Sequence, residues 1–357
     1  MQLPLPPSRL GSGTHTPAGS RSFAPWSLHW PVVEPITFPV AAGITAIDTF
    51  FGGRERYTAA YLLEAVEPTL VETGPTHSVE PVRAGLERLG IGAGDLAHIV
   101  VTHIHLDHAG GVGRLSEAFP RATVWVHERG APHLAEPSRL VASATRLYGE
   151  ADMGRLFGPV EPVGADRLRA LSDGDRLTMG DRSLEVLFTP GHASHQVALV
   201  DTATGAVFIG DALGIHLPDL PVLRPATPPP DVDVEAAVES IGRIRSHARS
   251  VLLFAHFGPI AEVDAICDLS IARWRAWARV VREAMATTED LEAITQRLLE
   301  ESRRDIQTGA ESRLDVQALE SRLGLLSSIR ANAQGLMRYW RKRAEREGDM
   351  PPGTTSP

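Results

Sequence analysis

The chain has 357 residues, 43% of them hydrophobic and 22% charged, which is typical of a folded globular protein with a substantial core. Acidic side chains outnumber basic ones by 44 to 35, so we expect no nucleic acid as a partner. No apolar run reaches the ~18 residues of a membrane span, no secretion signal is visible and there is one cysteine, so we expect a cytoplasmic protein without a membrane partner or an intrachain disulfide.

The chain is predicted to begin with a flexible arm, because residues 1–30 are rich in Pro, Gly and Ser and lack hydrophobic periodicity. Short β-like runs follow at 36–40, 57–64 and 69–72. A helix is predicted over 79–89, because its apolar side chains recur on one face.

The most informative segment is His103–His108, which places three histidines and one aspartate directly after the apolar run 98–101. On a strand-to-loop turn, His103 and His105 point the same way, whereas Asp107 and His108 begin the next element and face a second point. Imidazole and carboxylate together suit zinc, with iron, manganese, cobalt or nickel as other occupants. The motif therefore predicts a site that can provide ligands to two metal ions. The alternative is a cluster of histidines without a ligand role.

A helix over 110–119 and a strand over 122–127 are predicted next. Residues 129–157 are predicted to form helices that cover the metal site, and insertions of this kind usually decide the substrate. The candidate substrate contacts within them are His133, Arg139 and Tyr148. The alternative is that these side chains are merely solvated.

Three later segments each place one metal-ligating side chain after a short apolar strand. Strands are predicted over 183–189, 196–201 and 206–209, and their turns carry His192 and Asp211. His256 follows the apolar residues 253–255. Imidazole and carboxylate side chains that recur in this way extend the predicted metal site to the second half of the chain.

The proline-rich loop 217–230 is predicted to form one wall of the pocket, followed by a helix that is capped near Asp231 or Asp233. Within this loop, Arg224 is the candidate for holding a substrate carboxylate or another anion, because guanidinium pairs with such groups in bidentate geometry. The alternative is that Arg224 pairs with one of the protein's own acidic residues.

The remainder, 261–347, is predicted to be a helical extension, with an N-cap at 287–290 and a disordered tail over 348–357. Apolar stripes at 271–285 and 326–340 are expected to pack on the preceding domain or on each other, and a homodimer interface stays open. The basic cluster that contains Arg338 and Arg341 is expected to be a solvated helix face.

Taken together, the ligand motifs resemble the metallo-β-lactamase superfamily of metallohydrolases over about residues 36–260. The resemblance implies an α/β fold, an αββα sandwich of two mixed sheets flanked by helices, with a catalytic domain over 31–260. It also implies two divalent metal ions, with zinc as the first expectation and iron or manganese as others. The implied ligands of the first ion are His103, His105 and His192. Those of the second ion are Asp107, His108 and His256, and the carboxylate of Asp211 is implied to bridge the two ions.

Two departures from the family pattern bear on function. Some β-lactamases of this superfamily carry a cysteine at the position of Asp211, whereas the single cysteine here, Cys267, follows the last ligand, so antibiotic hydrolysis is a poor first expectation. Glu72 stands where relatives usually carry Asp, and we interpret it as an outer carboxylate that orients a ligand histidine. Its alternative role, as a cap of the following loop, is equally open.

The mechanism implied by the resemblance is hydrolysis by a hydroxide that bridges the two metal ions, with Asp211 as the shared ligand. Asp107 would orient this nucleophile and help to shuttle its proton. The expected substrate is a small-molecule ester, thioester or lactone. The alternatives are a thiol or persulfide oxygenase with a single iron, a nuclease or phosphodiesterase of the same fold, and a non-catalytic metal-binding protein.

Overall fold

The computed structural model describes residues 34–217, 222–309 and 316–347. The predicted N-terminal arm and C-terminal tail lie outside these residues, as does part of the predicted loop 217–230. None of the helices in the described part of the chain is long and apolar enough to cross a membrane.

The first sheet has seven strands within the described residues, and their order in the sheet is their order in the chain. β1 to β4 pair antiparallel, whereas β4 to β7 pair parallel. The carboxyl ends of β4, β5 and β6 therefore meet at one edge. The strands are β1 (Thr37–Ala41), β2 (Ile44–Asp48), β3 (Ala59–Leu63), β4 (Thr69–Val71), β5 (His98–Val100), β6 (Thr123–His127) and β7 (Leu168–Leu171).

The second sheet has six strands within the described residues, in the order β15-β14-β11-β10-β9-β8. It is antiparallel except for the parallel pair β11 and β14, which end at the same edge. A separate two-stranded ribbon joins β12 (Ile215–His216) and β13 (Leu223–Arg224). The strands of the second sheet are β8 (Arg176–Thr178), β9 (Ser183–Phe188), β10 (Val197–Asp201), β11 (Val207–Gly210), β14 (Leu252–Phe254) and β15 (Pro259–Ile260).

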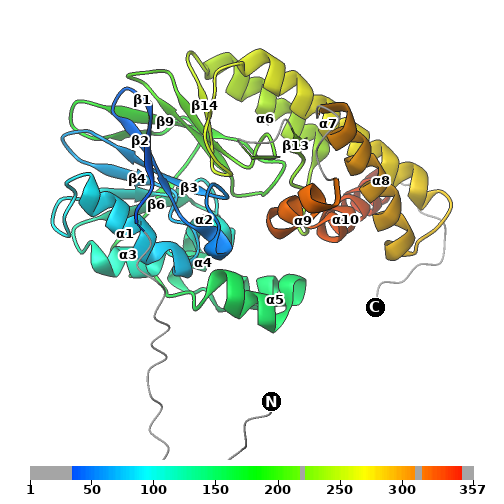
Figure 1. The fold of residues 1–357 in the computed structure, drawn as a ribbon, viewed down its shortest axis with the longest axis horizontal. Helices are drawn as coiled ribbons and strands as arrows, with labels where there is room; N and C mark the ends of the chain where they lie inside the picture. Colours follow the sequence, from blue (N-terminus) through cyan, green and yellow to red (C-terminus); the bar gives the residue numbers. More distant parts are fainter. Residues whose placement is uncertain (1–33, 218–221, 310–315, 348–357) are drawn as a thin grey trace, which may run out of the picture. The chain divides into compact units, whose positions relative to one another are not determined.

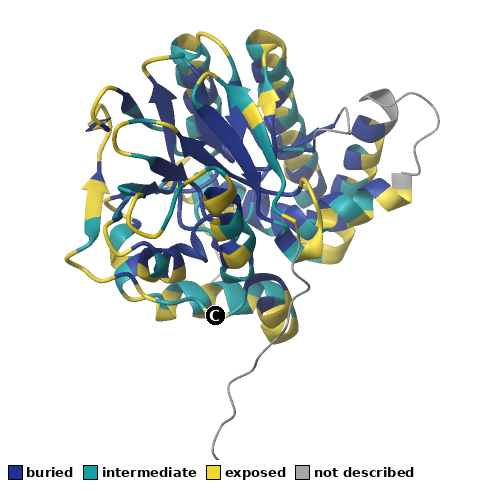
Figure 2. Cartoon of the chain, turned by 60° about the vertical axis from the view of Figure 1, so that its left-hand side comes forward, coloured by how far each residue is buried: buried dark blue, intermediate teal, exposed yellow. Residues whose placement is uncertain are grey.

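The two sheets pack face to face, and the strands that form them are buried along most of their length (Figure 2). Tyr61 of β3 meets Phe208 of β11 edge-on, with 5.4 Å between the ring centroids. Tyr61 also donates its hydroxyl to the carbonyl of Phe254, so that its polar end is satisfied inside this apolar layer. Burial of this layer is the main source of the sandwich's stability.

Helices cover both outer faces, as the predicted αββα sandwich requires (Figure 1). The first sheet is covered by α1 (Val79–Arg88) and α3 (Val112–Ala118), and a single turn, α2 (Leu106–Ala109), precedes α3. The second sheet is covered by α6 (Val234–His247) and α7 (Val263–Met285). Asp233 accepts a hydrogen bond from the amide of Ala236, which confirms one of the two predicted caps of α6.

The segment 129–157 is helical, as predicted. It forms α4 (Ala131–Ala135), α5 (Ser138–Asp152) and a π-helical turn, η3 (Met153–Phe157). Two short 3-10 turns also occur in the part of the chain that forms the first sheet, η1 (Phe51–Gly53) and η2 (Thr76–Ser78).

Three further helices follow α7, namely α8 (Leu291–Gly309), α9 (Val316–Leu326) and α10 (Ile329–Glu347). The apolar stripes predicted in this part pack within the chain, because Trp274 and Trp277 of α7 and Leu336 of α10 share one buried cluster with the second sheet. Asp290 accepts hydrogen bonds from the first amides of α8, which confirms the predicted N-cap.

The sequence analysis missed β2. Its five residues read ITAID, and all are buried between β1 and β3. Asp48 is satisfied there by the amides of Phe50 and Arg56, at 2.9 and 2.7 Å. A carboxylate that is buried by hydrogen bonds from its own flanking loop interrupts the local hydrophobic pattern, which explains the omission.

Gly335 allows α10 to lie directly on the loop after β13. A Cβ at this position would lie 2.0 Å from the carbonyl oxygen of Thr227, and backbone cannot yield to it. We expect Gly335→Ala to destabilise the protein by about 1–3 kcal/mol in urea denaturation. Gly324→Ala is the matched control, because a Cβ on α9 meets nothing within 4 Å. Equal stabilities of the two variants would contradict this packing.

Candidate metal centre

All seven predicted ligands follow strands at the edge where the two sheets meet. β5 leads to His103 and His105, and α2 carries Asp107 and His108, while β9, β11 and β14 lead to the other three. At Gly210 the two sheets approach closely, because a Cβ there would lie 2.5 Å from Thr102 Oγ1. The sandwich thus brings together residues that are far apart in the chain.

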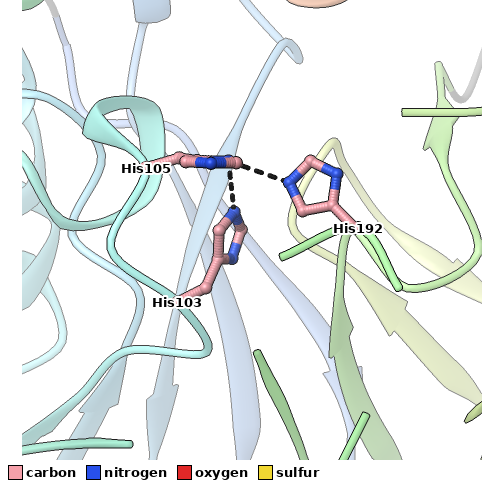
Figure 3. A group of neighbouring side chains, drawn as sticks. All are labelled: His103, His105 and His192. Atoms are coloured by element: carbon pink, nitrogen blue, oxygen red, sulfur yellow. Dashed lines mark hydrogen bonds between the residues drawn. The ribbon is translucent and has the colours of Figure 1, made fainter. Parts of the chain in front are cut away.

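Three histidines form a first group, drawn in Figure 3. His105 Nδ1 lies 3.1 Å from His103 Nε2 and 2.8 Å from His192 Nε2. His192 comes from the second sheet and the other two come from the first. Ring nitrogens that converge in this way could hold one metal ion.

Asp107, His108 and His256 form a second group that could also hold an ion. Asp107 Oδ2 lies 3.6 Å from His108 Nε2 and 3.5 Å from His256 Nε2. Both imidazoles are completely buried, whereas Asp107 is partly exposed. This group therefore has one side that is open to incoming molecules.

Asp211 lies between the two groups. Its Oδ1 is 3.4 Å from His108 Nε2 and 3.2 Å from His256 Nε2, on the side of the second group. Its Oδ2 is 3.6 Å from His192 Nε2, on the side of the first group. One buried carboxylate thus presents one oxygen to each group.

Hydrogen bonds on the far sides of the rings determine which nitrogen stays free. His192 Nδ1 donates to the carbonyl of Ala226 at 2.8 Å, and His256 Nδ1 donates to the carbonyl of Tyr57 at 3.3 Å. A carbonyl oxygen only accepts, so each ring holds its proton on Nδ1 and turns an unprotonated Nε2 toward the centre.

The charge states of the first group and of Asp211 favour binding of a cation. Burial lowers the pKa values of His103, His105 and His192, and the neighbouring imidazoles lower those of His103 and His105 further, so these rings stay neutral. Burial alone would raise the pKa of Asp211, but His256 and His108 outweigh it and hold that pKa well below its usual range. The first group therefore offers lone pairs, and Asp211 offers negative charge.

Buried polar atoms without a hydrogen-bond partner also indicate a cation site. Within the described residues, His108 Nε2, His256 Nε2 and Asp211 Oδ1 are buried and form no hydrogen bond, although they face one another. Buried polar atoms are normally paired. Imidazole nitrogens with carboxylate oxygens are a donor set that divalent transition metals accept, so the residues fit such ions.

Glu72 lies on the Nδ1 side of the His103 and His108 rings, away from the centre. Its Oε1 accepts hydrogen bonds from the hydroxyl and the amide of Thr102, at 2.5 and 3.3 Å, and that hydroxyl lies 3.1 Å from His103 Nδ1. Its Oε2 lies 3.5 Å from His108 Nδ1. Glu72 also has a positive φ of 67°, a conformation that costs a non-glycine residue energy and that these buried contacts maintain.

We expect Glu72→Gln to lower metal affinity by about 10- to 100-fold, because an amide cannot match the charge of the carboxylate beside His108 and Thr102. A competition titration against a chelator measures this change. Glu67→Gln is the control, because Glu67 is half exposed and contacts His98, outside the centre. Unchanged affinity in Glu72→Gln would leave Glu72 with only the loop-capping role.

A cavity of about 870 Å³ opens beside the centre, with His105, Asp107 and His192 in its wall. The three predicted substrate contacts from the covering helices, His133, Arg139 and Tyr148, all line it. The predicted loop wall is present as Pro228–Pro230. The helical extension takes part as well, through residues of α10 and the start of α8.

The structure contradicts the predicted substrate contact Arg224. Its side chain is 1% exposed and does not line the cavity. Its guanidinium donates to Glu320 at 2.6 Å, to Ser302 at 2.8 Å and to the carbonyl of Ser327 at 3.2 Å. β13 turns this residue toward α8 and α9, where a buried charge requires such partners. The alternative interpretation, pairing with the protein's own acid, is therefore the correct one.

Several cavity residues were missed. Arg338 and Arg341 are exposed, as expected for a solvated face, but that face also lines the cavity, as do Arg129 and Arg146. The available signal was spacing: Arg139 and Arg146 are two helical turns apart, and Arg338 and Arg341 are one turn apart. Spacing shows that two residues share a face of a helix, but it does not show whether that face borders a cavity or open solvent.

Two comparisons with known proteins point to the same family. A family model described as the Metallo-beta-lactamase superfamily matches residues 53–256. The solved structure of ST1585 from Sulfolobus tokodaii, a metallo-beta-lactamase superfamily protein, superposes with a TM-score of 0.59 at 21% identity, covering 83% of this chain and 98% of that one. At this identity the structural likeness concerns the fold alone.

Two curated relatives are enzymes. The hydroxyacylglutathione hydrolase of Gloeothece citriformis is 34% identical over 139 residues, which are 38% of this chain and 41% of the relative. The acyl-coenzyme A thioesterase MBLAC2 of Gallus gallus is 31% identical over 126 residues, 32% of this chain and 40% of the relative. The chain thus spans less than half the length of both.

Proposed function

Because the chain belongs to the metallo-beta-lactamase superfamily, we propose that it is a metal-dependent hydrolase that cleaves a small-molecule thioester, with an ester or lactone as the next candidate bond. The observation that carries the proposal is the position of Asp211, which presents one oxygen to each of two ligand groups.

The proposed ligands are those assigned from the sequence. His103, His105 and His192 would hold one divalent ion, zinc by first expectation, and Asp107, His108 and His256 would hold a second, with Asp211 shared. Divalent ions at this site would supply Lewis acidity that polarises a carbonyl and lowers the pKa of water. The tautomers fixed by Ala226 and Tyr57 keep the facing nitrogens available for that role.

Asp107 is the proposed proton carrier, because it is the partly exposed carboxylate between the centre and the cavity. In the proposed reaction, water forms a C–O bond to the acyl carbon and the C–S bond breaks. Asp107 accepts the proton from the water and passes it to the leaving thiolate. The products are a carboxylic acid and a thiol, so no oxidant or further reactant is needed.

The thioester is favoured because both curated relatives named above act on thioesters by their names, one on hydroxyacylglutathione and one on acyl-coenzyme A. The absence of a cysteine at position 211 continues to disfavour antibiotic hydrolysis as a first expectation.

The test is elemental analysis of the protein purified without added metal, followed by turnover assays on ester, thioester and lactone substrates. The proposal expects about two zinc or manganese ions per chain and thioester hydrolysis that a chelator abolishes. One iron per chain with substrate-dependent oxygen consumption would instead establish the oxygenase alternative. Full metal loading without turnover of any acyl or phosphoryl substrate would favour a non-catalytic protein.

A further inference from the structure

The cavity beside the metal centre is strongly basic. Five arginines among the described residues line it: Arg129, Arg139, Arg146, Arg338 and Arg341. The chain as a whole carries a formal net charge of −9, so this concentration of positive charge does not reflect the general composition of the surface.

The arginines come from two helices and one turn. Arg139 and Arg146 lie two turns apart on α5, and Arg338 and Arg341 lie one turn apart on α10, so each pair shares a face of its helix. Arg129 follows β6, where it donates to the carbonyl of Ser194 at 3.1 Å. Both helices are labelled in Figure 1. Two helices that are remote in the sequence therefore contribute charge to one cavity.

Most of this charge is not neutralised by the protein. Among the residues that the structure describes, no carboxylate lies within ion-pair distance of Arg139, Arg146 or Arg341. Arg338 donates to the carbonyl of Pro230, which is a neutral acceptor. All five side chains are exposed, so that an incoming molecule can reach them.

The acids in the same wall do not balance them. Asp107 belongs to the second ligand group, and Asp231 accepts a hydrogen bond from Ser194 at 2.5 Å. Glu289, just before α8, completes the acids of the wall among the described residues. The cavity therefore keeps an excess of guanidinium groups, which pair with phosphate and carboxylate oxygens in bidentate geometry.

We infer that the substrate is a thioester whose leaving group carries phosphates, of the acyl-coenzyme A class, and that the arginines of α5 and α10 hold those phosphates. This inference rests on the proposed thioesterase function and selects between the leaving groups that the two relatives suggest. A glutathione leaving group carries an ammonium as well as carboxylates, so its smaller net negative charge matches the arginine excess less well. The cavity of about 870 Å³ lies near the upper end of small-molecule sites and accommodates a leaving group of this size.

The experiment compares three thioesters of one acyl group, with coenzyme A, pantetheine and glutathione as leaving groups, on the metal-loaded protein. Pantetheine is the matched neutral control, because it keeps the thiol arm and lacks the phosphates. We expect the coenzyme A thioester to have the highest kcat/KM and the steepest loss of kcat/KM with added salt.

The variant is Arg146→Gln with Arg341→Gln, which removes one charge from each helix. We expect KM for the coenzyme A thioester to rise about tenfold with little change in kcat, and KM for the pantetheine thioester to stay unchanged. Arg275→Gln is the control, because Arg275 is an exposed arginine of α7 outside the cavity.

Binding provides a readout that does not depend on turnover. Calorimetry with adenosine 3′,5′-bisphosphate should show binding to the wild type that is weakened about tenfold in the double variant, whereas adenosine should bind neither protein measurably. Tighter binding of a short single-stranded RNA than of the bisphosphate would overturn the inference in favour of a nucleic acid.

The outcomes separate this inference from the proposed function. Equal kcat/KM values on the three thioesters, unaffected by the double variant, would overturn the phosphate site and leave the hydrolase intact. No turnover of any of the three, with both metals bound, would remove the thioesterase proposal and the inference together.

Discussion

Asp211→Ala is expected to lower the bound metal from about two ions per chain to one or fewer and to reduce thioester turnover by at least about a thousandfold. The reason is geometric, because no other described carboxylate presents its two oxygens to both ligand groups. Without it, His108 and His256 would keep only Asp107 as a neighbouring carboxylate, and Asp107 does not reach the first group. Elemental analysis and steady-state kinetics on the same preparation measure both effects.

Asp264→Ala is the matched control, because Asp264 is an exposed aspartate near the start of α7, outside the centre. It should keep the metal content and the turnover of the wild type. If Asp211→Ala retained two ions and full activity, the shared-ligand assignment would be wrong. If it retained the ions but lost activity, Asp211 would act on the substrate and not as the shared ligand.

Arg224→Leu is expected to lower the free energy of unfolding by about 3–5 kcal/mol, because it leaves the largely buried Glu320 without the guanidinium that neutralises it. The same change also removes the donor to Ser302 and to the carbonyl of Ser327, which connects β13 to α8 and α9. Urea denaturation measures the loss. A rise in KM with unchanged stability would restore the role in substrate binding that the structure contradicts.

Two controls separate the ion pair from the size change. Arg224→Leu combined with Glu320→Leu should recover most of the lost stability, because a buried ion pair is often replaced by apolar residues at little cost. Arg275→Leu, at an exposed position of α7, should change stability by less than about 0.5 kcal/mol. If the double variant were as unstable as the single one, loss of the contacts to Ser302 and Ser327 would account for the effect.

Much of the fold followed from local patterns. The outer helix α1, the strands β5, β6 and β9 to β11 and the caps at Asp233 and Asp290 lie where periodicity and capping residues predicted them. These features depend on neighbours within a few residues, so the sequence contains all the information they need. β2 is the counterexample, because its polar residues Thr45 and Asp48 are buried between two neighbouring strands, which the local pattern does not show.

The sequence by itself determined the set of candidate ligand residues, because imidazole and carboxylate at these spacings after short strands have few other uses together. Only the tertiary structure decided how they are arranged: that Asp211 lies between the groups, that Glu72 reaches both Thr102 and His108, and that Arg224 faces inward. It also decided that α10 contributes arginines to the cavity. Ligand chemistry is a property of each side chain, whereas the direction in which a loop or helix face points depends on packing between segments far apart in the chain.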